Sequence, residues 1–547
     1  MSKRVLSFFM ASLPLIAFGQ FNEAIGTYKD QVGRSVQRAK VDPGFIAAGE
    51  DGLTVFGGTE ASIVKTKPSG APVWAMVYGG VGNESFSSLR EVYAFSSLPV
   101  NGYAALGTTT TFNGSEDLYF VRTDLSGTPL YSFTFGTREG DDRGHCLQYI
   151  KDFSTGKYGY IMVGQTDSYH YYGDSTDILI VKTDEDGALI RAKVMGNAAN
   201  DIARWVEQTK DGGFVITGST RLGANSDIFV VRLDKDLNMV WQSIYRHCDV
   251  PYTEVGYGIV ENPIDGSLTV TGFTNSFGLE YSQDAFLLNL KPNGAVNWMR
   301  TYGTKEIEQG ISIDLSGGGS EYVVSGYAID GGGNKDAFIF KTDMAGNPIW
   351  SNLYGASSGN GEQGAEITND GGSGYIFTGF AESSYTINRD YYLVNLTSDG
   401  ISGGCEREFT REWKSHTPCT FANFQDVDVY DIKFACTQYE KVDYQARVCS
   451  GGESLRSLAE PREGSTDALT VIPNPTSTTV QVLFNDIAIP RKGGTLIVSN
   501  RSGKIVYKTF IDSGDVRIPV ETFPNDLYVV RFIGSDGKQY QKKFIKK

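Results

Sequence analysis

Short apolar runs, each flanked by Gly and Asp, recur between about residue 40 and residue 400. In the clearest copy the runs are Ala203–Gln208, Phe214–Thr217, Ile228–Leu233 and Met239–Tyr245. β-Branched and aromatic residues in runs of this length, separated by Gly-rich turns, predict β-strands. Each copy therefore predicts four strands, which we name a, b, c and d in chain order.

The pattern occurs seven times at a nearly constant period. Strand b ends at a glycine in every copy, and neighbouring glycines are 53 to 58 residues apart. Four-stranded units at this spacing predict a β-propeller, because β-helix repeats are shorter and tandem sandwich domains are longer. The glycines are Gly49, Gly107, Gly164, Gly218, Gly272, Gly326 and Gly379.

The N-terminal residues carry the strand that the seventh copy lacks. Phe21–Gln37 aligns with Trp298–Asp314, so that Phe21 takes the place of a tryptophan of strand d. After Asp390–Leu396 no strand d follows. An open ring would leave an unpaired edge strand. We therefore expect Phe21–Gly26 to complete the seventh blade and to close the ring.

Residues 1–19 have the features of a secretory signal peptide. Lys3 and Arg4 precede the apolar run Val5–Phe18, and small residues place the expected cleavage between Gly19 and Gln20. The run is short for a membrane span, and no later segment is long and apolar enough to anchor the chain. We expect an exported protein without a transmembrane segment.

Composition changes this picture little. The 65 glycines and 12% aromatic residues suit many short strands with tight turns. The net charge of −15 argues against a nucleic-acid partner and gives no reason to expect binding to anionic membranes.

Residues 401–453 contain four of the six cysteines. An even cluster in an exported chain predicts two disulfides, and three pairings remain open. The cluster has no CxxC spacing, so we expect no zinc site. The sequence thus predicts a small disulfide-bearing connector at 401–453, followed by a polar linker at 454–467. The cysteines are Cys405, Cys419, Cys436 and Cys449.

Residues 468–547 contain seven short strand candidates, which predict an Ig-like β-sandwich. The unit resembles the type A C-terminal sorting domain of type IX secretion cargo in Bacteroidetes. The resemblance rests on VIPNP with Pro473, Asn474 and Pro475, on LIVSNRSGKIVYK, and on a closing segment with Leu527, Tyr528 and the basic Lys542 and Lys543. The family more often has Gly before the aliphatic-Tyr pair, where this chain has Asn525-Asp526.

That resemblance implies a route and partners. It implies delivery through the outer-membrane translocon, contact with its shuttle and attachment components, and a final location on the cell surface or outside the cell. It also implies that the sorting domain is usually removed after delivery.

The seven copies resemble the delta-60-like and related bacterial propeller repeats. The matching motifs are clearest at Asp211–Thr220, Asp227–Asp234 and Leu237–Tyr245. This resemblance covers about residues 21–400 of the propeller expected at 20–400, and it supports the fold. It says little about function, because propellers host unrelated activities.

No established catalytic motif stands in a suitable context. The single GxSxG, Gly355–Gly359, follows strand d without the strand–turn–helix that a nucleophile elbow needs. We interpret the acidic c–d connections as turns. We interpret the Asp that begins strand c in six copies as a structural turn or capping residue. We therefore expect no cofactor and no metal, and we nominate no catalytic residue. The six residues are Asp117, Asp177, Asp227, Asp284, Asp336 and Asp390.

The candidate binding residues lie in loops at one end of the ring. In an up-and-down meander the b–c and d–a connections share one end, which we call the loop end. The b–c loops are long, dissimilar and rich in aromatic residues, as binding loops on a rigid scaffold often are. The alternative is that these aromatic side chains fold back onto neighbouring blades. The candidates are Tyr169, His170, Tyr171, Tyr172, His247, Tyr252, Phe277, Tyr281 and Tyr385.

The sequence therefore predicts an all-β chain with a seven-bladed β-propeller, a connector and a sorting domain. It favours a secreted or cell-surface binding and adhesion module for an unknown surface protein or glycan, or an accessory subunit of the surface secretion or gliding machinery. The alternative is a secreted hydrolase or lyase acting on polysaccharide or peptide. Acidic residues and histidines clustered in the central pore would favour the enzyme, and a Tyr-rich face poor in acidic residues would favour binding.

Overall fold

The computed structural model divides the chain into two compact units, Met1–Leu455 and Arg456–Lys547. Its described residues are 21–25, 30–52, 58–80, 82–92, 102–111, 115–136, 140–168, 176–196, 200–222, 225–247, 252–277, 282–329, 332–355, 361–370, 374–382, 389–403, 406–408, 412–416, 419–421, 425–427, 469–472, 479–484, 494–500, 505–511, 516–525, 527–534 and 539–546. Over these ranges the regular structure is entirely β, and none of it forms a helix long and apolar enough to cross a membrane. The signal peptide expected at 1–19, with its cleavage site at Gly19 and Gln20, lies outside them.

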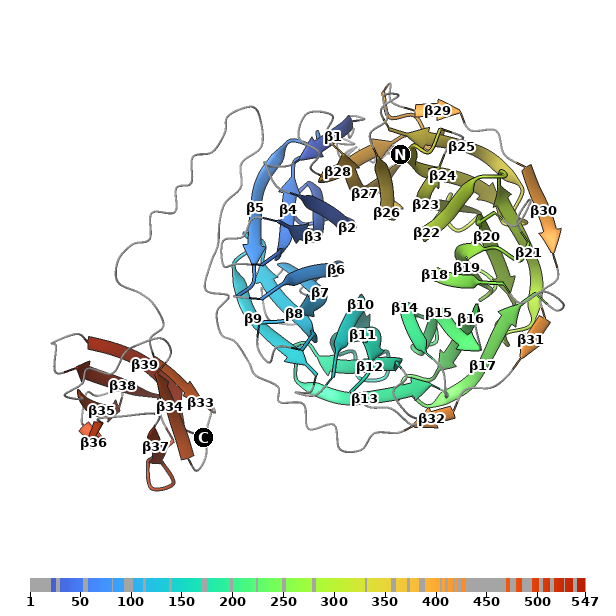
Figure 1. Cartoon of the computed structure of the whole chain (residues 1–547). Helices are drawn as coiled ribbons and strands as arrows, with labels where there is room; N and C mark the ends of the chain where they lie inside the picture. Colours follow the sequence, from blue (N-terminus) through green and yellow to red (C-terminus); the bar gives the residue numbers. More distant parts are fainter. Residues whose placement is uncertain are drawn as a thin grey trace, which may run out of the picture. The chain divides into compact units, whose positions relative to one another are not determined.

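Seven antiparallel sheets surround a common centre in the first unit, which gives a propeller-like ring (Figure 1). In each sheet strand a lies nearest the centre, and strand d lies farthest from it among the strands a to d. We number the sheets as blades 1 to 7. Blade 1 is β2 (Gln31–Ala39), β3 (Gly44–Asp51), β4 (Glu60–Thr66) and β5 (Pro72–Tyr78); blade 2 is β6 (Glu84–Val92), β7 (Gly102–Thr109), β8 (Asp117–Asp124) and β9 (Pro129–Phe135); blade 3 is β10 (Asp142–Lys151), β11 (Tyr158–Thr166), β12 (Asp177–Asp184) and β13 (Leu189–Gly196); blade 4 is β14 (Asp201–Gln208), β15 (Phe214–Leu222), β16 (Asn225–Leu233) and β17 (Met239–Arg246).

The remaining three blades follow the same order. Blade 5 is β18 (Glu254–Glu261), β19 (Leu268–Thr274), β20 (Asp284–Leu290) and β21 (Val296–Gly303); blade 6 is β22 (Ile307–Ser316), β23 (Glu321–Ile329), β24 (Lys335–Asp343) and β25 (Pro348–Tyr354); blade 7 is β26 (Glu362–Asn369), β27 (Tyr375–Glu382), β28 (Arg389–Leu396) and the N-terminal β1 (Phe21–Ile25). The a–b and c–d connections lie at the end opposite the loop end, and we call it the turn end.

The N-terminal strand is the outermost strand of blade 7. β1 pairs antiparallel with β28, with Phe21 opposite Asn395 and Ile25 opposite Tyr391. Phe21 is 8% exposed, and its ring lies 2.5 Å from where a Cβ atom of Gly70 in blade 1 would be. The first and last blades are thus joined by the strand that the sequence alignment placed there.

The glycine that ends each strand-b core is explained by close packing. A Cβ atom at any of the seven glycines would lie 1.7 to 1.9 Å from a carbonyl oxygen of strand a. In blade 1 that oxygen belongs to Val32, and strand a bulges between Gly33 and Ser35 opposite Gly49. No side chain fits there, so the glycine recurs with the period of the blades.

The aromatic residues of strand d fasten each blade to the next. The Trp241 ring of blade 4 lies against Gly294 of blade 5, and its Nε1 donates to the Pro292 carbonyl at 2.9 Å. The Tyr245 hydroxyl donates to the Gly294 carbonyl at 2.6 Å. Gly294 has a φ of 82°, which favours glycine. The same tyrosine–glycine bond joins Tyr78 to Gly127, Tyr302 to Gly346 and Tyr354 to Gly400.

Part of the segment predicted as a connector adds a fifth strand to four blades. β29 (Glu406–Glu408), β30 (Glu412–His416), β31 (Cys419–Phe421) and β32 (Gln425–Val427) pair with β25, β21, β17 and β13 in turn. The chain therefore runs back along the outside of the ring from blade 6 to blade 3. Cys419 lies opposite Arg246 in this pairing. Cys405, Cys436 and Cys449, with the linker at 454–467, lie outside the described residues.

The second unit consists of two antiparallel sheets. One has the order β33 (Leu469–Ile472), β34 (Thr479–Phe484) and β37 (Val516–Pro519); the other has β36 (Ile505–Ile511), β35 (Gly494–Asn500), β38 (Leu527–Gly534) and β39 (Gln539–Ile545). Val480 and Ile518 from the first sheet share one buried cluster with Leu496, Val530 and Phe544 from the second. The two sheets therefore enclose a core of their own.

Candidate functional site

Three of the nine predicted binding residues lie in the described part of the chain. The His247 ring packs against Phe277, with 4.7 Å between ring centroids. Phe277 is 8% exposed and belongs to the core cluster of blades 4 and 5, whereas Tyr252 is partly exposed. The Phe277 side chain therefore packs against the blades, which is the alternative to a role in binding. Tyr169, His170, Tyr171, Tyr172, Tyr281 and Tyr385 lie outside the described residues.

The bore of the ring contains a buried guanidinium that sequence reasoning did not single out. Arg90 lies on the inner strand of blade 2, and its Nη1 is 3.0 Å from Glu366 Oε1 of blade 7. Its Nε donates to Gln148 of blade 3 at 3.1 Å, and its Cζ lies 5.5 Å from the ring centroid of Trp205 in blade 4. One side chain thus reaches blades on both sides of its own. The side chains of Arg90 and Glu366 are only 7% and 8% exposed.

Two more acidic residues belong to this inner layer. Gln148 Nε2 donates to Glu207 Oε2 at 3.2 Å. Burial raises the pKa of Glu207 to about 7, although Arg90 opposes the shift. Asp314 accepts from the Thr368 hydroxyl at 3.0 Å and from the backbone of Asn369 at 2.9 Å. Glu207 and Asp314 therefore both accept hydrogen bonds from neighbouring residues of the ring.

The inner strands that carry these residues lie nearest the centre of the ring in Figure 1. Burial raises the pKa of Glu366, although Arg90 and the Ser35 hydroxyl oppose the shift. A substrate would have to displace the Arg90 contacts to reach Glu366. The layer could have been found by aligning the repeats, because Arg90, Glu207 and Asp314 occupy one register position of strand a.

The repeated aspartates of strand c form the second acidic feature. Asp284 and Glu308 lie in the first two residues of strands in adjacent blades and flank Gly303. A Cβ atom at Gly303 would lie 2.5 Å from Asp284 Cγ and 2.9 Å from Glu308 Oε2. Asp117 with Asp142 flank Gly136 in the same manner. Between blades 4 and 5 the place of the glycine is taken by Arg246, which lies 3.7 Å from Asp227.

These carboxyl pairs hold protons more tightly than free carboxyl groups do. Burial raises the pKa of Glu308 to about 7 and the pKa of Glu254 to about 8, and the adjacent Asp284 and Asp227 contribute to the respective shifts. Among the described residues, no group of three or more Asp, Glu, His or Cys side chains could hold a metal ion. The pairs lie between blades, and Asp284, Glu308 and Glu254 are at most 3% exposed, so these side chains are in contact with protein.

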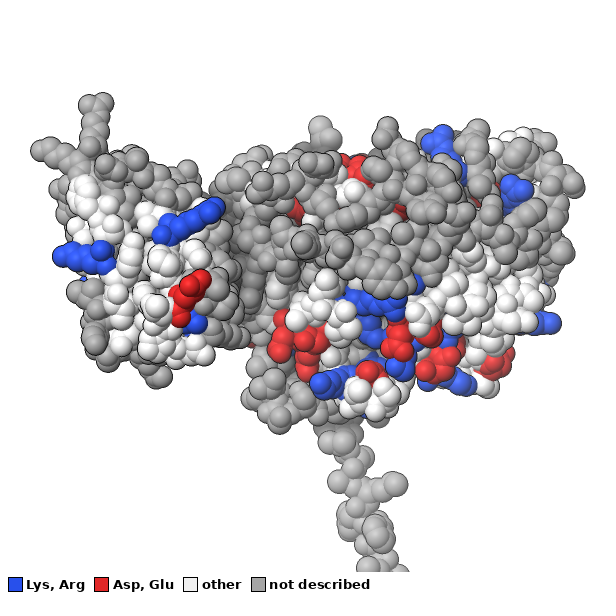
Figure 2. All heavy atoms as spheres, turned by 90° about the horizontal axis from the view of Figure 1, so that it is seen from below, with Lys and Arg blue, Asp and Glu red and all other residues white. Residues whose placement is uncertain are grey.

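Charge on the outer surface is mixed. Figure 2 shows Lys and Arg interspersed with Asp and Glu over the described surface in that view. Oppositely charged neighbours also form ion pairs on the surface, such as Arg143 with Glu116 and Lys235 with Asp236. The surface charge therefore does not by itself point to one binding patch.

The predicted sorting residues are partly described. Tyr528 is buried, and its hydroxyl donates to the Pro524 carbonyl at 2.7 Å. Leu527 begins the same strand, and Lys542 and Lys543 lie on β39 opposite Val530 and Val529. Pro473, Asn474 and Pro475 lie outside the described residues.

Residues 470–547 match the family model of the secretion system C-terminal sorting domain. This match indicates export by type IX secretion. The route leads to the cell surface or the extracellular space, and it implies interaction with the type IX secretion machinery. None of the curated proteins matches the sequence.

Solved structures resemble the chain only distantly. Sqt1 from Chaetomium thermophilum is 10% identical with a TM-score of 0.35, covering 68% of this chain and 98% of its own. A mutant apocarotenoid oxygenase from Synechocystis is 10% identical with a TM-score of 0.34, covering 73% and 95%. The WD40 domain of SCAP from fission yeast is 10% identical with a TM-score of 0.20, covering 96% and 87%. Similarity at this level carries no argument about activity.

Proposed function

We propose that the chain is a secreted or surface-displayed binding and adhesion module, built on a seven-bladed propeller with delta-60-like repeats. Its ligand is a surface protein or a glycan. The sorting domain supports the location, and a ring of rigid blades supports binding through the loops that the blades carry.

The observation that carries this proposal is the buried ion pair between inner strands of the ring. Arg90 contacts Glu366, Gln148 and Trp205 from three other blades, and the ion pair at its centre is almost fully buried. The acidic cluster that would favour an enzyme is therefore engaged in holding blades together. Recognition then falls to the two ends of the ring.

We assign the main contact surface to the loop end. The tyrosines at positions 169, 171, 172, 281 and 385 all fall in b–c connections, which share this end by the antiparallel pairing of strands b and c. Tyrosine combines a large contact area with a hydroxyl group, which suits both protein and glycan ligands. His247 and Phe277 would support this surface from below through their ring contact.

One observation favours the alternative, a hydrolase or lyase. Glu207 is a buried carboxyl group with a pKa raised to about 7 by burial, as in many general acids. It lies in the bore, so an enzyme of this kind would lose turnover when Glu207 is changed. A binding module would keep its affinity for the ligand when Glu207 is changed.

The remaining assignments complete the proposal. The mature protein begins at Gln20, the propeller ends near residue 400, the four cysteines of 401–453 form two disulfides, and the sorting domain at 468–547 is an Ig-like sandwich. An accessory role at the surface secretion or gliding machinery is a variant in which the ligand is a component of that machinery.

The test removes the loop tyrosines from the full-length secreted protein. Tyr169, Tyr171, Tyr172, Tyr281 and Tyr385 are changed together to Ala, and binding is measured on an array of glycans and outer-membrane proteins. A control variant changes Tyr158, which stacks on Tyr149 at the turn end. We expect the five-residue variant to lose the wild-type signal at an unchanged melting temperature. A signal that survives in it would contradict the assignment to the loop end.

A further inference from the structure

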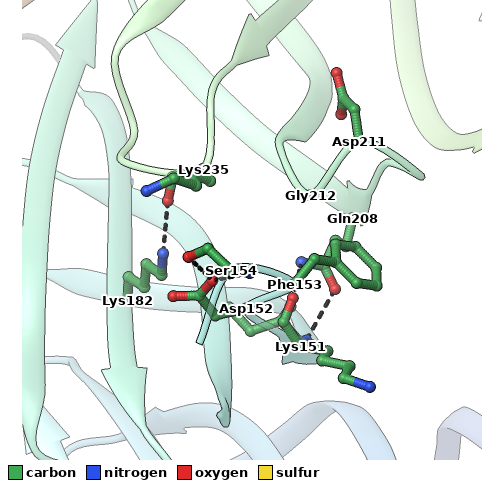
Figure 3. Close-up of a pocket in the computed structure, with 10 residues that line it drawn as sticks. Lys151, Asp152, Phe153, Ser154, Lys182, Gln208, Asp211, Gly212 and Lys235 are labelled. Atoms are coloured by element: carbon green, nitrogen blue, oxygen red, sulfur yellow. Dashed lines mark hydrogen bonds between the residues drawn. The ribbon is translucent and has the colours of Figure 1, made fainter. Parts of the chain in front are cut away.

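A cavity of about 290 Å³ lies at the turn end between blades 3 and 4. The a–b turn of blade 3 forms one side, and the a–b and c–d turns of blade 4 form the other (Figure 3). Gln208 fixes the two blades here: its Nε2 donates to the Lys151 carbonyl at 2.9 Å, and its Oε1 accepts from the Lys151 backbone at 3.0 Å. The walls are therefore held in place. They include Asp152, Phe153, Ser154, Lys182, Asp211 and Lys235.

The cation in this cavity has equivalents in other blades. Lys182 is opposite Arg191 near the end of strand c, and the same register position holds Lys65, Arg122, Arg232 and Lys341. Arg122 donates to the Tyr103 and Thr123 carbonyls of its own blade. The other three cations are paired with acids inside their own blades. Lys65 lies 3.8 Å from Asp42, Arg232 2.5 Å from Asp211, and Lys341 2.6 Å from Glu321.

Lys182 departs from this rule. Its Nζ donates to the Lys235 carbonyl of the next blade at 2.6 Å and lies 5.6 Å from the Phe214 ring centroid. Within the described residues it forms no ion pair. An ammonium group has three N–H donors, so two remain for the cavity. Burial lowers the pKa of Lys182, with several aspartates opposing the shift, as expected for a half-buried amine without a direct carboxylate partner.

Asp152, the acidic residue of the blade 3 turn, accepts hydrogen bonds within that turn and does not form an ion pair with Lys182. Counted along strand a, Asp152 takes the place in the blade 3 turn that Asp211 takes in blade 4, because Tyr149 and Gln208 occupy one register position. The Asp152 Oδ1 atom accepts from the Ser154 backbone at 2.8 Å, from the Ser154 hydroxyl at 2.5 Å and from the Thr155 backbone at 3.2 Å. This carboxylate closes its own turn, and the ammonium group of Lys182 is left facing the cavity (Figure 3).

An exposed aromatic ring forms another wall. Phe153 is 59% exposed, and its Cδ2 lies 2.9 Å from where a Cβ atom of Gly212 would be. One side of the ring thus rests on the turn of blade 4, and the other is open to solvent. An exposed aromatic face beside fixed polar groups is suited to stacking on the apolar face of a sugar ring.

We propose that this cavity binds a sugar residue that carries a carboxylate or phosphate group, with its ring on Phe153 and its anionic group on Lys182. The volume suits a single residue at the end of a chain or in a branch, and is at the small end of ligand sites. The site is separate from the loop end, so it adds a second contact to the binding module.

The probes for the test are glucuronic acid, glucose 6-phosphate, glucose, inorganic phosphate and a short polyglutamate peptide. Each is titrated into full-length protein by calorimetry. We expect glucuronic acid or glucose 6-phosphate to bind at least tenfold more tightly than glucose and than phosphate. The preference between the two acidic sugars identifies the anionic group.

Two variants and two matched controls locate the binding. Phe153→Ala and Lys182→Met should each weaken the acidic sugar at least tenfold. Ile264→Ala changes an exposed apolar residue in the a–b turn of blade 5, 72% exposed, and Lys157→Met changes an exposed lysine of the blade 3 turn. Both controls should bind within twofold of wild type, and all four should melt within a few degrees of it.

Each opposite result overturns a part of the proposal. Equal binding of glucose removes the role of the anion, equal binding of phosphate removes the role of the ring, and tighter binding of polyglutamate replaces the sugar with an acidic peptide. Absence of binding by every probe overturns the site. The five-tyrosine variant of the loop end should keep the acidic-sugar affinity, so failure of one site is distinguishable from failure of the other.

Discussion

The outer c–d corners and the inner strands of the ring follow opposite rules. At the corners the same residues recur: Tyr245 with Gly294 and Tyr302 with Gly346 make the same bond between different pairs of blades. In the bore one register position holds Arg90, Glu207 and other residues of different charge. Repetition marks contacts that every blade must make with its neighbour. A residue that differs from its equivalents in the other blades marks a contact that only one blade makes. These positions are the ones to test for function.

The largest effect is expected in the bore. Arg90→Ala leaves Glu366 buried without its guanidinium, which should lower the free energy of unfolding by about 3–5 kcal/mol. Urea unfolding of full-length protein, followed by tryptophan fluorescence, measures the change. The double variant Arg90→Met with Glu366→Leu removes both charges and should recover most of that loss. A loss below about 1 kcal/mol in Arg90→Ala would mean that the pair does not hold the bore.

A smaller effect is expected at a repeated corner. Gly346 has a φ of 78°, and a Cβ atom there would lie 2.8 Å from the Trp298 ring. Gly333 has a φ of 85° but nothing within 4 Å of its Cβ position. Gly333→Ala should therefore cost only the backbone strain, about 1–2 kcal/mol, and Gly346→Ala should cost about 1–3 kcal/mol more. Equal losses of unfolding free energy in the two variants would show that the ring contact is unimportant.

The smallest effect concerns pH and the carboxyl pairs between blades. Burial raises the pKa of Glu308 to about 7, and Asp284 adds to the shift. The folded chain thus holds this proton more tightly than the unfolded chain, whose value is about 4.3. The stabilisation is complete below that value and is lost as the pH rises through 7.

We therefore expect the melting temperature to fall between pH 5 and pH 8, as calorimetric scans can measure. Glu308→Gln should reduce the fall, because the amide stays neutral. Gln31 already stands at this place in blade 1. Asp186→Asn, at an exposed position in the c–d turn of blade 3, is the control and should leave the slope unchanged. A slope that is the same in wild type and Glu308→Gln would exclude the pair as its source.

Sequence reasoning found what repeats. The period of the strand-b glycines predicted the repeated four-stranded units. The alignment of Phe21 with Trp298 predicted that the N-terminal strand completes the last unit, where β1 pairs with β28. These signals exist because identical contacts constrain identical residues.

The sequence did not reveal features formed once. The strands β29 to β32 are three to five residues long and have no periodic pattern of their own. Arg90 and Glu366 meet across blades 276 positions apart in the chain, and nothing local to either residue signals the contact. The cavity beside Lys182 could not be predicted without knowing where three turns from two blades lie in space. Contacts between distant elements are decided by packing, which a single sequence does not display.

The most direct test of the central claim asks what happens to a bound ligand. A glycan or protein captured on the array is incubated with full-length protein, with the Glu207→Gln variant and with the five-tyrosine loop variant, and it is then analysed by mass spectrometry. A binding module predicts that the ligand is recovered intact in every case and that only the loop variant fails to retain it. Cleavage of the ligand by wild type, lost in Glu207→Gln, would contradict the account and identify the bore as an active site.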